Sequence, residues 1–213
     1  MNIIGSHNSM SYQDSISWYG FLLKPFSKCQ DYSIDVLLTR RMVRALDIRL
    51  CIRNGKWHFV HGLYLMQEMK DSFWDNLKYD IYILNINTLC LRIILEDLKE
   101  DIPAYQIDYI YSNLEFLVNW GNLHNRRIIP YAGYLKDHLD YKVWDFSKFS
   151  EGITINEFQY VSSIKGCGIL PRLWTRFNKK SLEKIFLNVI RNPEFYIKDT
   201  INIYYFDFLY SII

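Results

Sequence analysis

No stretch of this 213-residue sequence approaches the roughly 20 consecutive apolar residues that a helix needs to cross a bilayer. Polar residues follow the first four residues at once, so we expect no signal peptide. Lys and Arg are scattered, with no polybasic cluster that would bind anionic lipid by charge alone. A net charge of +2 and a pI near 8.2 are too balanced to indicate a nucleic-acid partner. We therefore expect a cytoplasmic protein without a transmembrane segment, for which peripheral contact with a membrane stays open.

Cysteine is present, but none of it has the C-x-x-C spacing of a metal or redox motif, and a chain of this length does not depend on disulfides. We expect Cys29, Cys51, Cys90 and Cys167 to be reduced thiols in the core. Linkers, repeats and low-complexity segments are also lacking, while 50% of the residues are hydrophobic, enough for a sizeable core. The prediction is one domain over residues 1–213, of unknown oligomeric state.

Extended and helical patterns alternate along the chain. The expected strands are 2–6, 45–53, 56–61, 91–96, 127–131, 142–146 and 201–209. The expected helices are 33–41, 71–86, 104–120 and a stripe over 182–190 that Pro193 closes. Strands mixed with helices favour a parallel sheet, and seven or eight strands favour an α/β fold, a single-domain (β/α) TIM-type barrel. Such barrels typically have roughly 250 residues, so connections must be trimmed. The tight turn at Asn54 and Gly55, too short for a crossover helix, is one such place.

Four polar side chains stand at the ends of the expected strands. His7 follows the first strand and His61 ends the third. Asp47 and Arg49, two residues apart on the second, face the same side. Active sites of such barrels lie at the carboxyl ends of the strands, so we expect these four to converge there.

These residue types suit phosphodiester cleavage. Two imidazoles, with ordinary pKa values near 6.5, can divide general base and general acid work. An arginine offers a charged fork to phosphate, and a carboxylate can orient either partner. Taken singly, His7 or His61 is more often a structural histidine, and Asp47 with Arg49 is as often an ordinary ion pair. His58, on the opposite strand face from His61, is expected to face solvent.

Taken together, these segments resemble the catalytic X domain of phosphatidylinositol-specific phospholipase C, especially its small, X-domain-only members. The match is specific over residues 2–98. It consists of the Gly-Ser-His-Asn-Ser motif at residues 5–9, the segment 30–34 before a helix, the strand 44–49, the Phe-Val-His-Gly-Leu segment at 59–63 and the strand 92–95.

This resemblance implies a mechanism. His7 matches the general base that deprotonates an inositol hydroxyl, and His61 matches the general acid that protonates the leaving oxygen. Arg49 matches the arginine that replaces calcium in the metal-independent bacterial enzymes, with Asp47 supporting it. Asp207 resembles the late aspartate that pairs with the base.

The sequence also departs from the family. Asn8 stands where the bacterial enzymes have an aspartate, although calcium-dependent members have Asn there as a ligand. Leu98 aligns with a position that is a ligand or lysine in relatives, and the nearest inward polar residue is Glu96. Asn8 and Glu96 are therefore expected to bind substrate. Arg49 would repel calcium, so we expect neither a metal nor another cofactor.

The leading hypothesis is a metal-independent phosphodiesterase that cleaves a phospholipid headgroup at a membrane interface through a cyclic phosphate. The alternative is a catalytically weak X-like domain that serves as a lipid- or phosphate-binding or interaction module. A third possibility keeps the barrel but acts on another headgroup, as in glycerophosphodiester- or sphingomyelin-cleaving relatives, whose metal-binding carboxylates Arg49 disfavours. Residues 18–23 and 63–66 carry aromatic and aliphatic side chains that can dip into headgroups or pack over the barrel.

Overall fold

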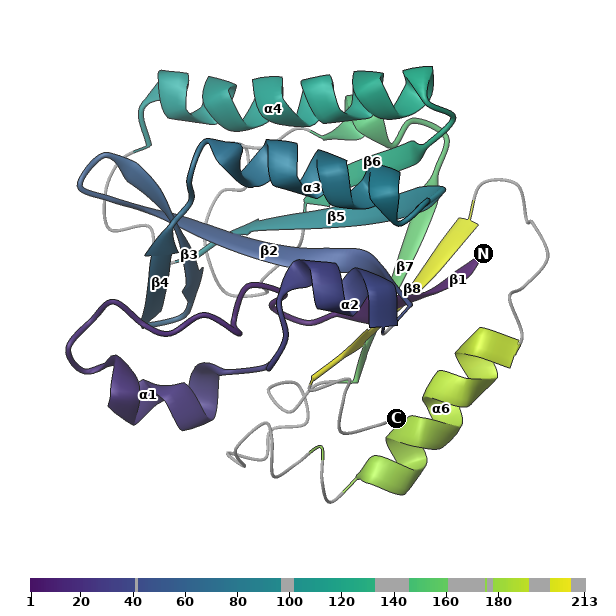
Figure 1. Cartoon of the computed structure of the whole chain (residues 1–213), viewed down its shortest axis with the longest axis horizontal. Coiled ribbons are helices and arrows are strands. Elements are labelled where there is room, and N and C mark those ends of the chain that lie inside the picture. The colour runs from purple at the N-terminus through teal and green to yellow at the C-terminus, as the bar shows by residue number, and fades with distance from the viewer. Residues whose placement is uncertain are drawn as a thin grey trace.

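The computed structural model describes residues 1–40, 42–96, 102–132, 146–160, 175, 178–191 and 200–207. Over these ranges, strands form a curled sheet with helices on its outside (Figure 1). The strands are β1 Asn2–Ser6, β2 Val43–Arg53, β3 Lys56–His61, β4 Tyr64–Glu68, β5 Thr88–Leu95, β6 Arg127–Ala132, β7 Thr154–Tyr160 and β8 Thr200–Phe206. The helices are α1 Gly20–Ser27, α2 Ile34–Arg40, α3 Ser72–Ile83, α4 Ala104–Leu123 and α6 Lys179–Arg191, with a 3₁₀ turn, η2, at Ser147–Phe149.

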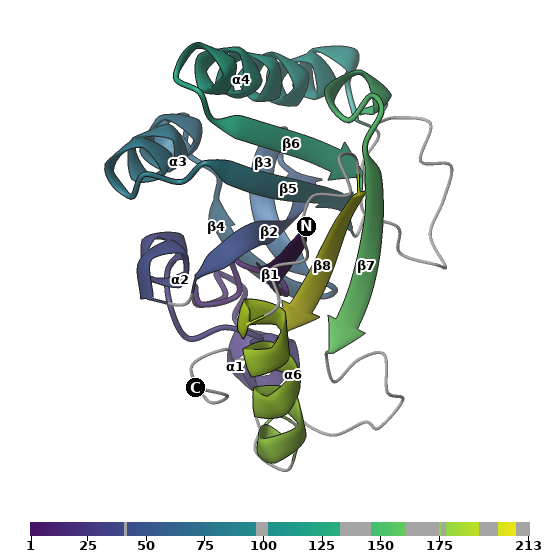
Figure 2. The same cartoon turned by 90° about the vertical axis from the view of Figure 1, so that its right-hand side faces the viewer.

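Six of the strands run parallel in the order β6-β5-β2-β1-β8-β7. Figure 2 shows this sheet curling from β6 round to β7, with α2, α3 and α4 along its outer side. Within the described ranges, β6 and β7 share no ladder of hydrogen bonds. The predicted α/β architecture of the TIM-barrel type, trimmed in its connections, is confirmed. The single domain over residues 1–213 stays a prediction.

The strand expected at 56–61 is present as β3, and the expected tight turn makes it half of a hairpin and not a further parallel strand of the barrel. Asn54 and Gly55 turn the chain with φ values of 53° and 71°, and β3 returns antiparallel along Leu50–Arg53, followed by β4. β1 pairs only with the beginning of β2, up to Leu46, which leaves the rest of that edge to β3. His61 therefore reaches the barrel mouth because its strand runs back toward it.

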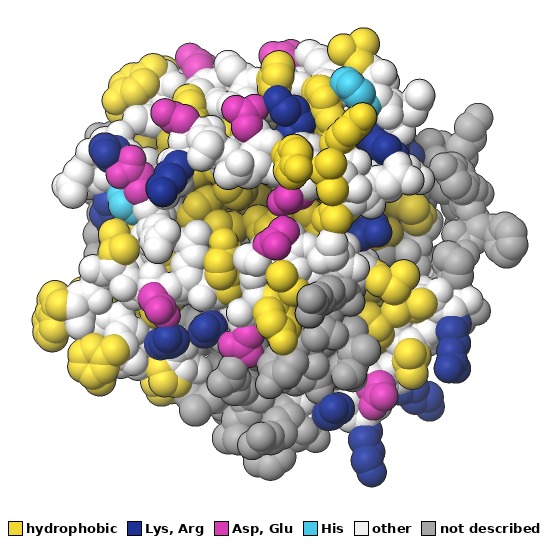
Figure 3. All heavy atoms as spheres, viewed as in Figure 1, with side chains coloured by type: hydrophobic (Ala, Val, Ile, Leu, Met, Phe, Trp, Pro, Cys, Tyr) yellow, Lys and Arg dark blue, Asp and Glu magenta, His cyan; other side chains and the backbone are white. Residues whose placement is uncertain are grey.

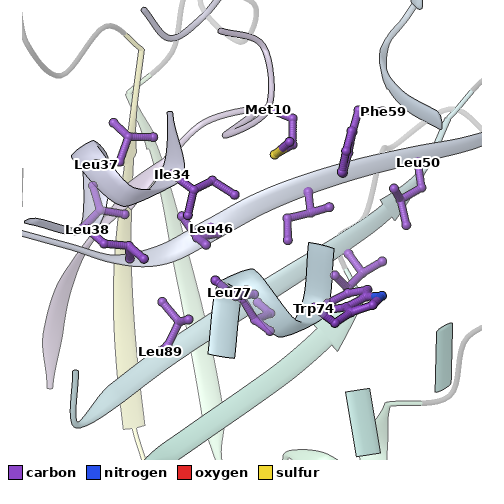
Figure 4. Packing of buried hydrophobic residues seen from close by; sticks show 14 of the residues in the cluster. Met10, Ile34, Leu37, Leu38, Leu46, Leu50, Phe59, Trp74, Leu77 and Leu89 are labelled. Carbon is purple, nitrogen blue, oxygen red and sulfur yellow. The ribbon is translucent and has the colours of Figure 1, made fainter. Parts of the chain in front are cut away.

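The hydrophobic core has two layers because successive side chains of a strand point to opposite faces. Outward side chains of β2 and β5 pack against α2 and α3, as Figure 4 shows for Leu46, Leu77 and Leu89. The inward ones form a second cluster inside the curl, made of Ile3, Ala45, Cys90, Ile129, Tyr131, Ile201, Ile203 and Tyr205. Asp47 and Arg49 continue the inward row that begins at Ala45, so the interior becomes polar toward the carboxyl ends of the strands.

The remaining helix and strand predictions are confirmed to within a few residues, except strand 142–146, which lies outside the described residues apart from Phe146. Sequence reasoning missed α1, β4 and β7. Cys29, Cys51 and Cys90 are buried, as predicted, and form no disulfide among the described residues; Cys167 lies outside them. His58 does not face solvent: it is buried, with Nδ1 3.3 Å from the carbonyl oxygen of Met66. No described helix is both long and apolar enough to cross a membrane.

Candidate active site at the mouth of the barrel

Six of the seven predicted site residues come from five strands and meet at one end of the curled sheet. They are His7 after β1, Asp47 and Arg49 on β2, His61 at the end of β3, Glu96 after β5 and Asp207 after β8. Five of these six side chains are at most 7% exposed, and His61 is partly buried. Their catalytic and binding roles remain predictions.

His7 is held between a carboxylate and a guanidinium group. Its Nδ1 lies 2.6 Å from Oδ1 of Asp207, and its Nε2 lies 2.7 Å from Nη2 of Arg49. A carboxylate only accepts and a guanidinium only donates, so Nδ1 carries the proton and Nε2 offers its lone pair. His7 is thus held in the tautomer of a general base.

Gln30 positions this pair. Its Nε2 donates to the carbonyl oxygens of His7, at 3.1 Å, and Phe206, at 2.9 Å. These bonds tie the end of β1 to the end of β8, directly before Asp207. The chain segment before α2 therefore fixes the spacing between the imidazole and its carboxylate.

Arg49 is bonded on three sides. Its Nε and Nη2 donate to Oδ2 of Asp47 at 3.2 and 3.0 Å, and its Nη1 donates to Oε1 of Glu96 at 2.5 Å. The predicted support of Arg49 by Asp47 is present, and Glu96 points into the same site. One oxygen of each carboxylate, Oδ2 of Asp47 and Oε1 of Glu96, is thus bonded to a fixed positive charge.

His61 faces His7 edge-on, with ring centroids 5.6 Å apart and ring planes at 87°. Its Nδ1 donates to the carbonyl oxygen of Ser27, the last residue of α1, at 2.7 Å. Burial, together with the nearby charge of Arg49, lowers the pKa of His61 to about 4. This imidazole is therefore neutral at neutral pH. Its pKa lies well below the ordinary value that the sequence analysis assumed.

The carboxylates are held ionised by the arginines. Burial disfavours the charge on Asp47, but Arg49 and Arg92 outweigh it and hold the Asp47 pKa well below its usual range. Glu96 behaves in the same way: burial opposes ionisation, and Arg49 with His61 brings the net pKa below the ordinary value. Nη1 of Arg92 lies 3.5 Å from Oδ2 of Asp47, while its Nε lies 2.8 Å from Oε1 of Glu157 on β7.

Asn8 sits in the turn after β1 with a positive φ of 42°, a conformation that asparagine adopts more readily than most residues. Its backbone N–H donates to Oδ2 of Asp47 at 3.0 Å. The side-chain amide is fully buried, and neither of its polar atoms has a hydrogen-bond partner among the described residues. A buried amide in this state is costly unless a ligand pairs with it.

Sequence reasoning missed the roles of Cys29 and Arg92. Sγ of Cys29 lies 3.8 Å from Nδ1 of His61, and burial with the nearby Asp207 carboxylate raises the thiol pKa well above its usual value. The alternating pattern of β5, with Cys90 and Arg92 on one face, could have identified Arg92 as an inward charge. No motif in the sequence indicates Cys29. Leu98, the other position discussed above, lies outside the described residues.

Comparison with known proteins finds neither a matching family model nor a matching curated protein. Solved structures do match. One variant of the phosphatidylinositol-specific phospholipase C from Staphylococcus aureus superposes with a TM-score of 0.59 at 13% identity, over 99% of this chain and 89% of that one. A pentafluorophenylalanine-containing variant gives 0.57 at 14%, over 99% and 90%, and a double variant gives 0.56 at 14%, over 99% and 89%. At these identities the comparison shows a fold like that of phosphatidylinositol-specific phospholipase C.

Proposed function

We propose that this protein is a phosphoric diester hydrolase that cleaves the headgroup from a phospholipid. The first candidate substrate is an inositol phospholipid. The proposal rests on the pair of imidazoles at the barrel mouth. The ring centroids of His7 and His61 lie 5.6 Å apart, and Arg49 is bonded to His7. Acid–base cleavage of a phosphodiester needs a base, an acid and a cation within reach of one phosphorus atom. The likeness in fold to a phospholipase C adds support.

In the first step His7 acts as general base. Its Nε2 takes the proton of a headgroup hydroxyl next to the phosphate, and that oxygen attacks phosphorus to close a cyclic phosphate. Nε2 is bonded to Arg49 in the free protein, so the phosphate must draw Nη2 of Arg49 away from it. Asp207 stabilises the imidazolium that forms, because its carboxylate accepts the Nδ1 proton.

His61 acts as general acid in the same step. As the bond from phosphorus to the diacylglycerol oxygen breaks, the imidazolium of His61 protonates that oxygen. A bound phosphodiester anion raises the pKa of His61 from its value of about 4 toward neutrality, which supplies the protonated form. Water can then open the cyclic phosphate with the two histidines in exchanged roles.

Arg49 takes the place of a metal ion. Asp47 and Glu96 hold its guanidinium plane in position, and the phosphate oxygens receive its donors as charge develops. Asn8 supplies an unpaired amide for a substrate oxygen. The reaction on this account needs no cofactor.

The membrane side of the molecule is the rim patch, defined as Ile16, Trp18, Phe21, Leu22, Phe26 and Leu63. These side chains are exposed, Trp18 to 83% and Phe21 to 69%. They gather over α1, where Figure 3 shows hydrophobic side chains at the lower left of the molecule. Because Ser27 at the end of α1 is bonded to His61, a bilayer touching the rim patch presents its headgroups to the site.

One observation favours the alternative, a catalytically weak module that binds a lipid or phosphate. A pKa of about 4 leaves His61 unprotonated in the free protein at neutral pH. If a bound phosphodiester does not raise this value, the site can hold a phosphate on Arg49 without cleaving it.

The test is a panel of phospholipid vesicles incubated with purified protein, with and without a chelator, and assayed for released phosphorylated headgroup. We expect release from inositol phospholipid with chelator present. Binding to the same vesicles without release from any lipid establishes the binding module instead. Release only after calcium is restored contradicts the role given to Arg49.

A further inference from the structure

Cys29 is the one described cysteine that lies at the proposed catalytic site. Its backbone N–H donates to Oγ of Ser11 at 2.9 Å, which fixes it just after α1. The side chain is 1% exposed, and its Sγ lies 3.8 Å from Nδ1 of His61. The thiol forms no disulfide with another described cysteine and takes part in no step of the proposed reaction.

Cys29, His7 and His61 together have the spacing of a metal site. One ligand atom from each residue lies within 4.8 Å of those of the other two. In tetrahedral zinc sites, with Zn–N near 2.0 Å and Zn–S near 2.3 Å, ligand atoms are roughly 3.3–3.8 Å apart. Side-chain shifts of about one ångström therefore bring the three atoms onto a single ion.

His7 already has the outer partner that zinc-bound histidines usually have: its Nδ1 donates to Asp207, which fixes the ring and leaves Nε2 for the metal. The nitrogen of His61 that lies 3.8 Å from Sγ is Nδ1, so this atom must release its bond to the Ser27 carbonyl, and its proton, to take the ion. An ion on Nε2 of His7 displaces Nη2 of Arg49 from that atom, while Nε still donates to Asp47 and Nη1 still donates to Glu96.

Around the site the buried carboxylates outnumber the guanidinium groups. Three buried carboxylates, Asp47, Glu96 and Asp207, surround the site, against two guanidinium groups, Arg49 and Arg92. One nitrogen, one thiolate sulfur and a second nitrogen form a donor set that suits Zn²⁺, whereas Ca²⁺ and Mg²⁺ require oxygen ligands.

We propose that Cys29, His7 and His61 form an inhibitory Zn²⁺ site. On binding, the thiol releases its proton to solvent, a Zn–S bond forms, and the ion takes a lone pair from each imidazole. Neither ring can then move a proton, so turnover stops until the ion is removed. The regulatory part of this inference rests on the proposed function, but the metal site itself does not.

The site is tested first by binding, with Co²⁺ as a spectroscopic probe of the intact protein. We expect one Co²⁺ per chain, a thiolate-to-cobalt charge-transfer band, and loss of that band when Zn²⁺ is added. Cys29→Ser should abolish the band, and Cys51→Ser, which changes a buried thiol elsewhere on β2, should keep it. Should Cys29→Ser unfold, Cys29→Ala and thermal unfolding of the wild type with and without Zn²⁺ decide instead. A wild type without the band, or a Cys29 variant that retains it, overturns the site.

Regulation is tested separately on inositol phospholipid vesicles. Micromolar Zn²⁺ should inhibit the wild type at least about 10-fold, reversibly by chelator, and Cys29→Ser should need at least about 10-fold more Zn²⁺ for the same inhibition of its own activity. Equal sensitivity in both proteins contradicts the regulatory role. If the wild type turns over no lipid, the proposed function fails while the cobalt spectrum still decides the site.

Discussion

At the scale of single residues, the ionised groups of the site depend on one another for their charge and position. Arg49 is the centre: it meets His7, Asp47 and Glu96, and the pKa values of both carboxyl groups depend on it. His61 stands beside this network without a carboxylate of its own, and burial leaves it neutral. His7 is thus ready to act as a base in the free protein, whereas His61 becomes an acid only when a bound phosphodiester raises its pKa.

Replacing Arg49 by lysine tests the geometry of this centre at constant charge. An ammonium group cannot bridge Asp47 and Glu96 and also meet a phosphate. We expect turnover to fall by about 10²–10³-fold, the usual effect of losing a placed donor. Unfolding experiments should also show lower stability, by about 1–3 kcal/mol, because buried acceptors lose partners.

The matched control is Arg126→Lys. Arg126 also reaches two acceptors, Asn85 and Asn87, but it is only partly buried and lies just before β6, at the amino ends of the strands. It should change neither quantity much. Equal turnover in Arg49→Lys and wild type would remove the guanidinium from the mechanism.

His61 predicts how stability depends on pH. Its pKa is about 4 in the folded protein and about 6.5 when unfolded, so the unfolded chain binds more protons between these values. Stability from this group is complete above pH 6.5 and is lost as the pH falls toward 4. Thermal unfolding between pH 7 and 5 should show a smaller decrease for His61→Gln than for wild type. Parallel curves for the two proteins would mean that His61 titrates normally.

At the scale of elements, the β2–β3 hairpin delivers the second histidine. The turn between β2 and β3 contains Gly55, with φ 71°. At the other end of β3, Gly62 follows His61 with φ 56°, and its N–H donates to Oε2 of Glu96 at 2.7 Å. Open space surrounds the Cβ position of both glycines, so alanine there meets backbone strain alone.

Gly55→Ala and Gly62→Ala therefore form a matched pair. Each should lower stability by about 1–2 kcal/mol, the cost of a left-handed conformation for a residue with a Cβ. Only Gly62→Ala should also lower turnover, because the strain can be relieved by moving His61 or by breaking the bond to Glu96. Turnover losses of the same size in both variants would show that the hairpin is not what places His61.

The elements also show what sequence could and could not predict. The i, i+2 spacing of Asp47 and Arg49 and the strand-end positions of His7 and His61 were sufficient to predict that they converge. The short turn at Asn54 and Gly55 was predicted, but its antiparallel consequence for the place of β3 in the barrel was not drawn. β7 was missed because its inward side chains include Glu157, which pairs with Arg92 in space and breaks the apolar alternation. Cys29 and Gln30 gain their roles only from contacts between distant segments.

At the scale of the whole molecule, the site and the rim patch lie at the same end, joined by α1. The sequence did not predict α1, because Pro25 lies inside it and its apolar residues do not form a single buried face. Its last residue contacts His61, while Ile16 before it donates to the carbonyl oxygen of Leu65 on β4. The apolar surface is thus attached to both the hairpin and the catalytic groups.

Removing two side chains of the rim patch, in Trp18→Ala with Phe21→Ala, should weaken binding to inositol phospholipid vesicles by at least about 10-fold, since a buried aromatic contributes roughly 1.5–3 kcal/mol. Vesicle sedimentation measures this. The control is Tyr105→Ala with Phe116→Ala, which removes two exposed aromatics, 64% and 54% exposed, from α4 on the far side of the sheet. Should both pairs bind like wild type, the rim patch is not the membrane contact.

The central claim is that two histidines and an arginine cleave a phosphodiester without a metal. Its most direct test is ³¹P NMR of inositol phospholipid incubated with wild type, His7→Gln and His61→Gln in the presence of chelator. We expect the wild type to produce a cyclic phosphate of the headgroup first and its ring-opened ester later. Each variant should be slower by at least about 10²-fold, the lower range for a positioned acid or base. The mechanism would be contradicted if the wild type released no phosphorylated product. It would also be contradicted if a folded variant reacted as fast as an active wild type.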